Sequence, residues 1–376
     1  MHSAAPIGVV GAGLSGLIAA MRLHSAGHEV IVWETRDRIG GRTWSPAIGP
    51  NSMQLDLGAA WHWAEHTRVQ GLAEELDIER IVQHEPGTAL YEPGTALYEP
   101  HAEQPVQRFP WPETPPHSWR LQGGTHALAR ELAAQLPSGT VKLGHHVTAG
   151  CQTDTGVQVQ IDSSDGSSSA TVARLIVAVP PRLVAHTIDF DPALPDTLTS
   201  AQRKTPTWMA ASGKAVATFG DAFWRRQGID GRVVSHAGPV AHWHDAVAPN
   251  GRAALAGFLH PTGLQTLATN EREALHNAIR KQLAHCFGDD APTPTAIATS
   301  NWRTDPATTP PGADPLYVEH PPAPPAVLTQ PHWNGRLVWA SAETATEHPG
   351  YLDGAIEAGE RAVQQVLEAA SLVLDR

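Results

Sequence analysis

The chain has little cysteine, few basic residues and no long hydrophobic run. Cys151 and Cys286 are the two cysteines among 376 residues, too few for a disulfide framework, although a single bridge stays open. No window holds 18 consecutive apolar residues, and the apolar segment 7–10 follows Met1 without a basic leader. We therefore expect no secretion signal and no membrane span, and a reduced cytoplasmic location.

The charge balance excludes several kinds of partner. Lys and Arg total 26 against 38 Asp and Glu, a formal net charge of −12. Such a surface repels nucleic-acid phosphates and anionic lipid, so neither is an expected partner. Apolar residues make up 41% and charged residues 17% of the chain, which is typical of a globular protein long enough for two domains.

Residues 7–34 predict a strand, a glycine turn, a helix and a second strand. Gly11, Gly13 and Gly16 form a G-x-G-x-x-G motif between the first strand and the helix. They allow a tight turn, close approach of a pyrophosphate and close helix packing, respectively. Glu34 ends the second strand, where a carboxylate accepts ribose hydroxyls and disfavours a 2′-phosphate. This motif predicts a dinucleotide site that does not take NADP.

Two further glycines, Gly40 and Gly41, stand before Arg42 and indicate a second backbone approach to a phosphate, which NAD sites do not need. Together, residues 7–42 resemble the FAD fingerprint of the flavin amine oxidase family. The resemblance implies that four side chains contact the adenosine and phosphates of FAD: Ser15, Glu34, Arg36 and Arg42.

The C-terminal part carries the most specific resemblance. Residues 343–346 and 350–361 are similar to the C-terminal signature of monoamine oxidases. The resemblance implies that Glu343 binds the cofactor and that a helix starting near Leu352 points its N-terminus at the flavin. The positive end of a helix dipole there stabilises the negative charge of reduced flavin.

Other positions extend the resemblance along most of the chain. Val147 matches a valine that touches adenine, and Trp302 matches a tryptophan beside the flavin. Where mitochondrial monoamine oxidases have the cysteine that fixes FAD covalently, this chain has Ala313, so we expect noncovalent FAD. Three further segments are similar to the family: 56–61, 122–125 and 178–181.

Two residues are candidates for catalysis. Lys214 opens a predicted strand and is followed by Phe-Trp-Arg at 223–225. This resembles the amine oxidase segment whose lysine reaches flavin N5 through a water, whereas composition alone favours a surface lysine. Tyr351 matches one of the two aromatic rings that frame the amine. The second ring has no match, so three aromatic residues are candidates to replace it in the substrate pocket: Trp61, Trp208 and Tyr317.

The resemblance implies an α/β fold in which a Rossmann-like FAD-binding domain is interrupted by a smaller α+β substrate domain. We assign 1–80, 120–203 and 304–376 to the FAD-binding domain, and 81–119 and 204–303 to the substrate domain. Further helices are predicted at 68–77, 125–136, 270–287 and 352–370. Further strands are predicted at 141–148, 157–161, 175–179, 214–219, 253–258 and 337–340.

Residues 81–119 are fewer and richer in proline than the helical insertion that covers the family's substrate cavity. PGTALYE occurs twice in this segment, at 86–92 and 93–99. We favour a surface loop and keep a lid over the cavity, formed by the Leu-Tyr pairs at 90–91 and 97–98, as the alternative. The site is then either open or closed by a second subunit of a homodimer.

His242, His244 and Asp245 form a possible metal-ligand cluster. Because no further ligand set accompanies them, we expect exposed histidines on an edge strand and no metal. The sequence therefore predicts an FAD-dependent amine oxidase that transfers hydride from an amine to flavin N5. Reoxidation by O2 gives H2O2 and an imine, which hydrolyses to an aldehyde or ketone. The alternatives are an L-amino acid oxidase, a flavin desaturase, or an FAD-holding interaction protein without catalysis.

Overall fold

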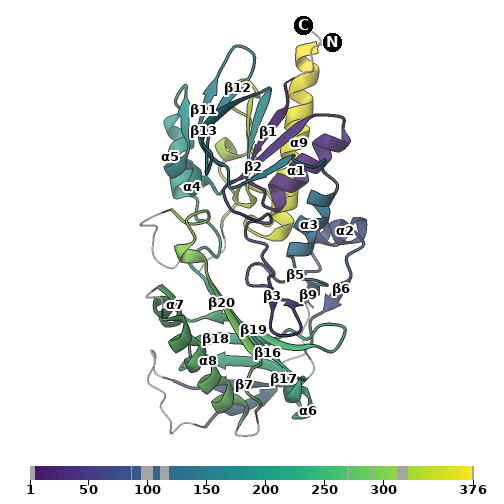
Figure 1. Cartoon of the computed structure of the whole chain (residues 1–376), viewed down its shortest axis with the longest axis vertical. Coiled ribbons are helices and arrows are strands. Elements are labelled where there is room, and N and C mark those ends of the chain that lie inside the picture. Colours follow the sequence, from purple (N-terminus) through teal and green to yellow (C-terminus); the bar gives the residue numbers. More distant parts are fainter. Residues whose placement is uncertain are drawn as a thin grey trace.

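The computed structural model describes residues 5–85, 87–94, 105–110, 118–268, 271–288, 291–310 and 321–374. The molecule is elongated, with one lobe built on a parallel sheet and another on a larger, mainly antiparallel sheet (Figure 1). The parallel sheet has the strand order β10-β2-β1-β14-β21. Its strands are β1 (Ile7–Val10), β2 (Val30–Glu34), β10 (Val141–Leu143), β14 (Arg174–Val177) and β21 (Leu337–Trp339).

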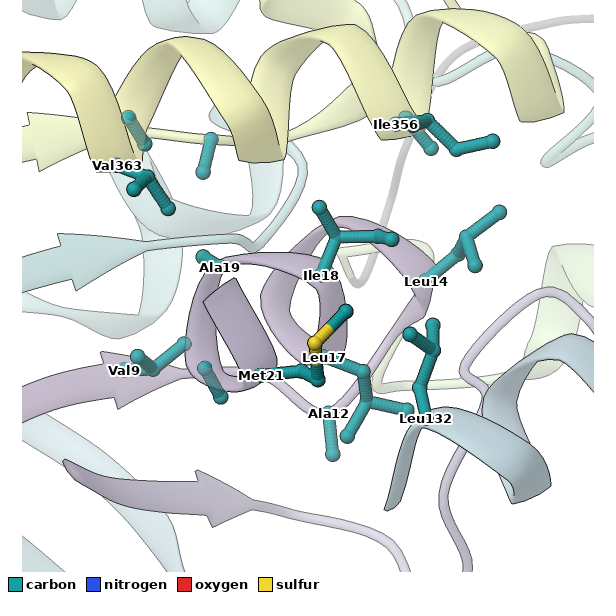
Figure 2. Packing of buried hydrophobic residues seen from close by; sticks show 14 of the residues in the cluster. Val9, Ala12, Leu14, Leu17, Ile18, Ala19, Met21, Leu132, Ile356 and Val363 are labelled. Atoms are coloured by element: carbon teal, nitrogen blue, oxygen red, sulfur yellow. The ribbon is translucent and has the colours of Figure 1, made fainter. Parts of the chain in front are cut away.

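The predicted strand–helix–strand unit at the N-terminus is confirmed. Helix α1 (Leu14–Ser25) follows β1 and packs between the parallel sheet and α9 (Leu352–Leu374). Figure 2 shows α1 with Ile18 directed toward Ile356 of α9 and with Leu132 of α3 (His126–Ala134) close by. Because α1 is covered on several sides, it is apolar almost all round its circumference.

Two glycines permit the close approach of these elements. A Cβ at Gly16 would lie 2.0 Å from the carbonyl oxygen of Gly11, and a Cβ at Gly359 would lie 2.6 Å from the carbonyl oxygen of Ser15. The first contact places α1 against the glycine turn, as the motif predicts. The second brings α9, about two turns from its start, against the first turn of α1.

A four-stranded sheet covers part of the parallel sheet, with the order β13-β12-β11-β15. The strand predicted at 141–148 is in fact two strands, because Gly144 (φ +69°) ends β10 before β11 begins. The predicted strands also omit β13, which lies between the strands predicted at 157–161 and 175–179. The bounds are β11 (His146–Gln152), β12 (Val157–Ser163), β13 (Gly166–Val172) and β15 (Asp189–Asp191). Helix α4 (Pro181–Thr187) precedes β15, and α5 (Asp196–Lys204) follows it.

The second lobe contains a seven-stranded sheet with the order β20-β16-β19-β18-β17-β7-β8. Helices α7 (Pro261–Ala268) and α8 (Arg272–Phe287) lie along it, with α6 (Phe223–Arg226) at one end (Figure 1). Its strands are β7 (Thr88–Glu92), β8 (Gln107–Pro110), β16 (Gly213–Phe219), β17 (Ile229–Ser235), β18 (Val240–Asp245), β19 (Ala253–Leu259) and β20 (Ala296–Asn301).

This sheet corrects two expectations. The histidines at 242 and 244 are not on an edge strand, because β18 lies between β19 and β17; His242 is exposed and His244 is partly buried. The first PGTALYE copy is not a surface loop, because it forms β7, in which Ala89 and Leu90 are buried. Leu90 therefore cannot cover the cavity. Most of the second copy, including Leu97 and Tyr98, lies outside the described residues.

Small elements connect the two lobes. Strand β9 pairs with β5 and β6, and β3 pairs with β4. Their bounds are β3 (Ala47–Ile48), β4 (Met53–Gln54), β5 (His62–Trp63), β6 (Arg80–Val82) and β9 (Ser118–Leu121), with α2 (Thr67–Glu75) after β5 and short 3-10 helices at 302–304, 326–328 and 342–344. No helix within the described residues is long and apolar enough to cross a membrane. Our domain bounds stay a prediction.

Candidate active site

A cavity of about 430 Å³ runs from the glycine turn after β1 to the beginning of β16. This volume is within the range of about 300–1,000 Å³ that is usual for small-molecule sites. At one end, Gly13 is the N-cap of α1 and provides no side-chain cap. Gly13, Leu14 and Ser15 line the cavity, so the first turn of α1 presents backbone N–H groups and a positive dipole to it.

The two glycine segments lie side by side in the wall of the cavity. Gly13 and Gly40 form an isolated parallel bridge. Gly40 (φ +90°) and Gly41 (φ +56°) have backbone conformations that favour glycine. A Cβ at Gly41 would lie 3.3 Å from the Cα of Gly13. The chain is therefore shaped so that a phosphate-bearing ligand can approach backbone from two segments.

Glu34 is almost completely buried next to this glycine turn. Its Oε2 accepts a hydrogen bond from the backbone N–H of Ala12 at 2.8 Å, and its Oε1 accepts one from the N–H of Arg36 at 3.0 Å. The guanidinium of Arg36 reaches across to Asp305 at 3.0 Å and to Thr308 at 2.7 Å. The sequence analysis did not identify Asp305 and Thr308, which follow Trp302 closely in the chain and belong to no recognised motif.

Arg42 and Glu343 form a bidentate ion pair. Arg42 Nη1 lies 2.6 Å from Glu343 Oε1, and Nη2 lies 3.0 Å from Oε2. The Glu343 carboxylate is fully buried and does not line the cavity, whereas Arg42 does. The structure thus shows Glu343 holding Arg42 at the cavity wall. Direct contact of either residue with a cofactor stays a prediction.

Aromatic residues surround the point where α9 begins. The ring of Tyr351 lies 6.1 Å from Trp63, 6.4 Å from Trp208 and 5.0 Å from His66, measured between centroids. Tyr351, Trp208 and Trp63 line the cavity, as does Leu352 in the first turn of α9. The N-terminus of this helix therefore faces the cavity, as predicted from the C-terminal motif.

Lys214 projects into the cavity from the beginning of β16. It is 5% exposed, so the alternative of a surface lysine is wrong. Its Nζ has no hydrogen-bond partner and lies 4.5 Å from the ring centroid of Trp61 and 5.1 Å from that of Phe258. Burial lowers the pKa of Lys214 to about 8, against the opposing influence of Asp56. Lys214 is therefore an amine that exchanges a proton near physiological pH.

Around Lys214, two residues that the sequence analysis did not select for the substrate pocket, Phe258 and His244, join the predicted Trp302. Phe258 lies directly opposite Lys214 in the β16–β19 pairing. His244 of β18 packs its ring 5.3 Å from Trp61, and burial lowers its pKa to about 3, so this histidine is neutral at physiological pH. Trp302 lines the cavity and donates its indole N–H to the carbonyl of Leu57. The described residues that line the Lys214 end of the cavity are therefore largely aromatic and include no acidic side chain.

The cavity brings together most of the predicted site residues. Gly16 and Glu343 support the wall without lining it, and Tyr317 lies outside the described residues. The described residues contain no cluster of three metal-ligating side chains. The predicted residues that line the cavity are Gly11, Gly13, Ser15, Glu34, Arg36, Gly40, Gly41, Arg42, Trp61, Val147, Trp208, Lys214, Trp302, Tyr351 and Leu352.

A Rossmann-type sheet, an uncapped helix N-terminus and a glycine cradle that continues to an aromatic chamber define a dinucleotide-dependent oxidoreductase. The family model described as flavin containing amine oxidoreductase matches residues 106–367, and that of an NAD(P)-binding Rossmann-like domain matches 9–76. The chain belongs to the flavin-containing amine oxidase family. It is an FAD-dependent enzyme that oxidises amines.

Individual relatives agree with this assignment. A putative flavin-containing monoamine oxidase AofH of Mycobacterium tuberculosis is 28% identical, over 95% of both chains. The flavin-containing amine oxidase B of Homo sapiens is 25% identical, over 98% of this chain and 87% of that one. Two solved structures share the fold at 21% identity: a putrescine oxidase bound to putrescine (TM-score 0.76; 98% and 99% covered) and the cyclohexylamine oxidase of Brevibacterium oxydans (TM-score 0.77; 98% and 100% covered).

Proposed function

We propose that this enzyme oxidises a monoamine with an apolar, ring-containing body, using O2 as electron acceptor and releasing H2O2. The imine product then hydrolyses to an aldehyde or ketone. The observation that carries the proposal is the position of Lys214, which lies buried and without a hydrogen-bond partner in an aromatic end of the cavity. Bound FAD supplies the two-electron acceptor for the hydride of the substrate's α-carbon.

The charges around the cavity select against substrates with a second cation. Among the described residues that line the cavity, Glu34 is the one acidic residue, and it belongs to the glycine-turn end. At the other end stand Trp61, Phe258 and the partly protonated Lys214. A buried cation repels an ammonium and favours a neutral amine, and none of the described residues that line this end of the cavity offers a carboxylate for the far end of a diamine.

Three side chains have proposed roles in this chamber. Tyr351 and Trp208 form two adjoining aromatic walls, which frame the approach of the amine and exclude water. We propose Trp208 as the replacement for the missing second aromatic ring. Lys214 Nζ holds or releases a proton close to the reacting centre, because its lowered pKa lets it exchange one near neutral pH.

The cavity does not favour oxidation of an α-amino acid. Such an enzyme needs a cation for the substrate carboxylate, and Arg36 and Arg42 are the arginines that line the cavity. Both are already paired, Arg36 with Asp305 and Arg42 with Glu343. The aromatic chamber with its unpartnered lysine also favours a catalytic protein over an FAD-holding interaction protein.

A peroxide-coupled assay of matched amines tests the substrate class. We expect turnover with benzylamine and cyclohexylamine, and at least about tenfold lower kcat/KM with putrescine, because a second ammonium would be desolvated without a partner. A preference for putrescine, or for phenylalanine over benzylamine, would contradict the proposal. Gel filtration tests the alternative of a homodimer, and cell fractionation tests the cytoplasmic location.

A further inference from the structure

A second cavity lies on the other side of the segment that contains Ala60 and Trp61. Its volume is about 220 Å³, and its walls come from 52–56, 120–124 and 246–252. We call it the Arg120 chamber. Ala60 and Trp61 also line the large cavity, so one peptide segment separates the two spaces. None of the predicted cofactor-binding residues lines the Arg120 chamber.

Arg120 of β9 is a buried cation without a carboxylate partner. It is 8% exposed. Its Nε donates to the side-chain oxygen of Gln83 at 3.1 Å, and its Nη2 donates to the carbonyl of Val247 at 2.8 Å. Within the part of the chain that the structure describes, Nη1 has no hydrogen-bond partner, and no carboxylate lies within ion-pair distance of the guanidinium. Burial lowers the pKa of Arg120.

Two carboxylates, those of Asp245 and Asp56, stabilise the charge of Arg120 from a distance, but both are bound to other groups. Asp245 binds Arg225 through both carboxylate oxygens, at 2.8 and 2.9 Å. Asp56 lines the chamber, but its Oδ1 accepts three hydrogen bonds, from the Ser45 hydroxyl and from the N–H and hydroxyl of Thr125. Burial raises the pKa of Asp56. A buried charge is costly unless an ion pairs with it, and none of the described carboxylates forms an ion pair with Arg120.

We propose that the Arg120 chamber binds a small carboxylate anion, which pairs with the free Nη1 of Arg120. The planar guanidinium matches a planar carboxylate and offers it charged hydrogen bonds. The chamber has room for a small organic acid. This site goes beyond the amine oxidation proposed above and does not depend on it.

The chamber is connected to the wall of the substrate cavity through Gln83. The same side-chain oxygen of Gln83 that accepts from Arg120 also accepts from the indole N–H of Trp61, at 2.9 Å. The side-chain amide of Gln83 donates to the carbonyl of Asp245 at 2.8 Å. Arg120 therefore lies two hydrogen bonds from Trp61, whose ring contacts Lys214.

Saturation-transfer NMR on the FAD-loaded enzyme, with acetate as the probe, tests the site directly. The wild-type enzyme is expected to transfer saturation to the acetate methyl group. In Arg120→Gln the transfer should fall about tenfold, as expected when a charged hydrogen-bond donor is lost. Arg252→Gln is the matched control, because Arg252 is exposed and donates to the carbonyl of Asn51; it should keep most of the transfer.

A second variant separates binding from folding. Ala248→Phe keeps Arg120 but places a ring in the chamber that Ala248 lines, so it should also abolish the transfer. FAD content checks that each variant is folded, and if Arg120→Gln does not fold, Ala248→Phe decides. The proposal is overturned if the wild-type enzyme shows no saturation transfer to acetate. It is also overturned if Ala248→Phe or a folded Arg120→Gln keeps the wild-type transfer, or if Arg252→Gln loses as much transfer as Arg120→Gln. Displacement of acetate by an equal concentration of inorganic phosphate would overturn the assignment to a carboxylate.

Discussion

Replacing Lys214 with methionine should stabilise the protein while it impairs the enzyme. The Lys214 ammonium is buried without a hydrogen-bond partner, and its pKa falls from 10.5 to about 8 on folding. Because a pKa shift of one unit corresponds to about 1.36 kcal/mol, keeping Lys214 protonated in the folded state lowers the free energy of unfolding by about 3 kcal/mol. Methionine has a similar length and no charge, so it removes this cost without opening a cavity.

The gain in stability has a definite pH dependence. Below pH 8 both the folded and the unfolded lysine are protonated, so the full cost is present. Between pH 8 and 10.5 the unfolded chain binds the proton and the folded protein does not, so the stability of the wild type rises with pH. The free energy of unfolding of Lys214→Met should therefore exceed that of the wild type by about 3 kcal/mol at neutral pH. This difference should shrink toward zero near pH 10.5.

Urea unfolding of the FAD-loaded wild type and variant, at neutral pH and near pH 10, measures this difference. Lys204→Met is a suitable control, because Lys204 is exposed at the end of α5, and its replacement should give no gain that depends on pH. A Lys214→Met variant less stable than the wild type at neutral pH would refute the reasoning, as would an equal gain at both pH values.

Three further predictions concern the cofactor and the chemistry. Acid or heat should release intact FAD into solution, because no cysteine stands at the covalent-linkage position; flavin retained on the denatured chain would contradict this. Lys214→Met should keep FAD but slow reoxidation of the flavin by about 100-fold, as for other lost proton-positioning groups. Stopped-flow absorbance measures the rates of flavin reduction and reoxidation separately. Unchanged rates of both steps would exclude a catalytic role for Lys214. Tyr351→Ala should slow flavin reduction by amine more than it weakens FAD binding; loss of flavin with normal reduction in the remainder would make Tyr351 structural.

The cofactor end of the site could be predicted because the residues that form it are close together in the sequence. Gly11, Gly13 and Gly16 form one short turn, and a backbone that approaches a phosphate needs glycine at those positions. The structure places this turn and Gly40–Gly41 side by side. Lys214 could also be selected from its segment. Its burial could not be predicted, because the partners that cover it, Trp61 and Phe258, are distant in sequence.

The misassigned elements show what local patterns leave out. Strand β13 has a run of serines that lacks apolar alternation, and it is a strand because its backbone pairs with β12. Similarly, the local duplication within a proline-rich segment favoured a surface loop. Pairing of residues 88–92 with β17 and β8 nevertheless makes the first copy a strand with a buried face. Strand pairing between distant segments decided both cases.

The central claim is that an amine delivers its electrons to FAD in the chamber beside Lys214. Mixing the enzyme with benzylamine under anaerobic conditions, while recording the visible spectrum, tests this most directly. We predict that the absorbance of oxidised flavin disappears at about one equivalent of amine and returns when air is admitted, with formation of H2O2. A flavin spectrum that stays unchanged with every monoamine tried would contradict the account.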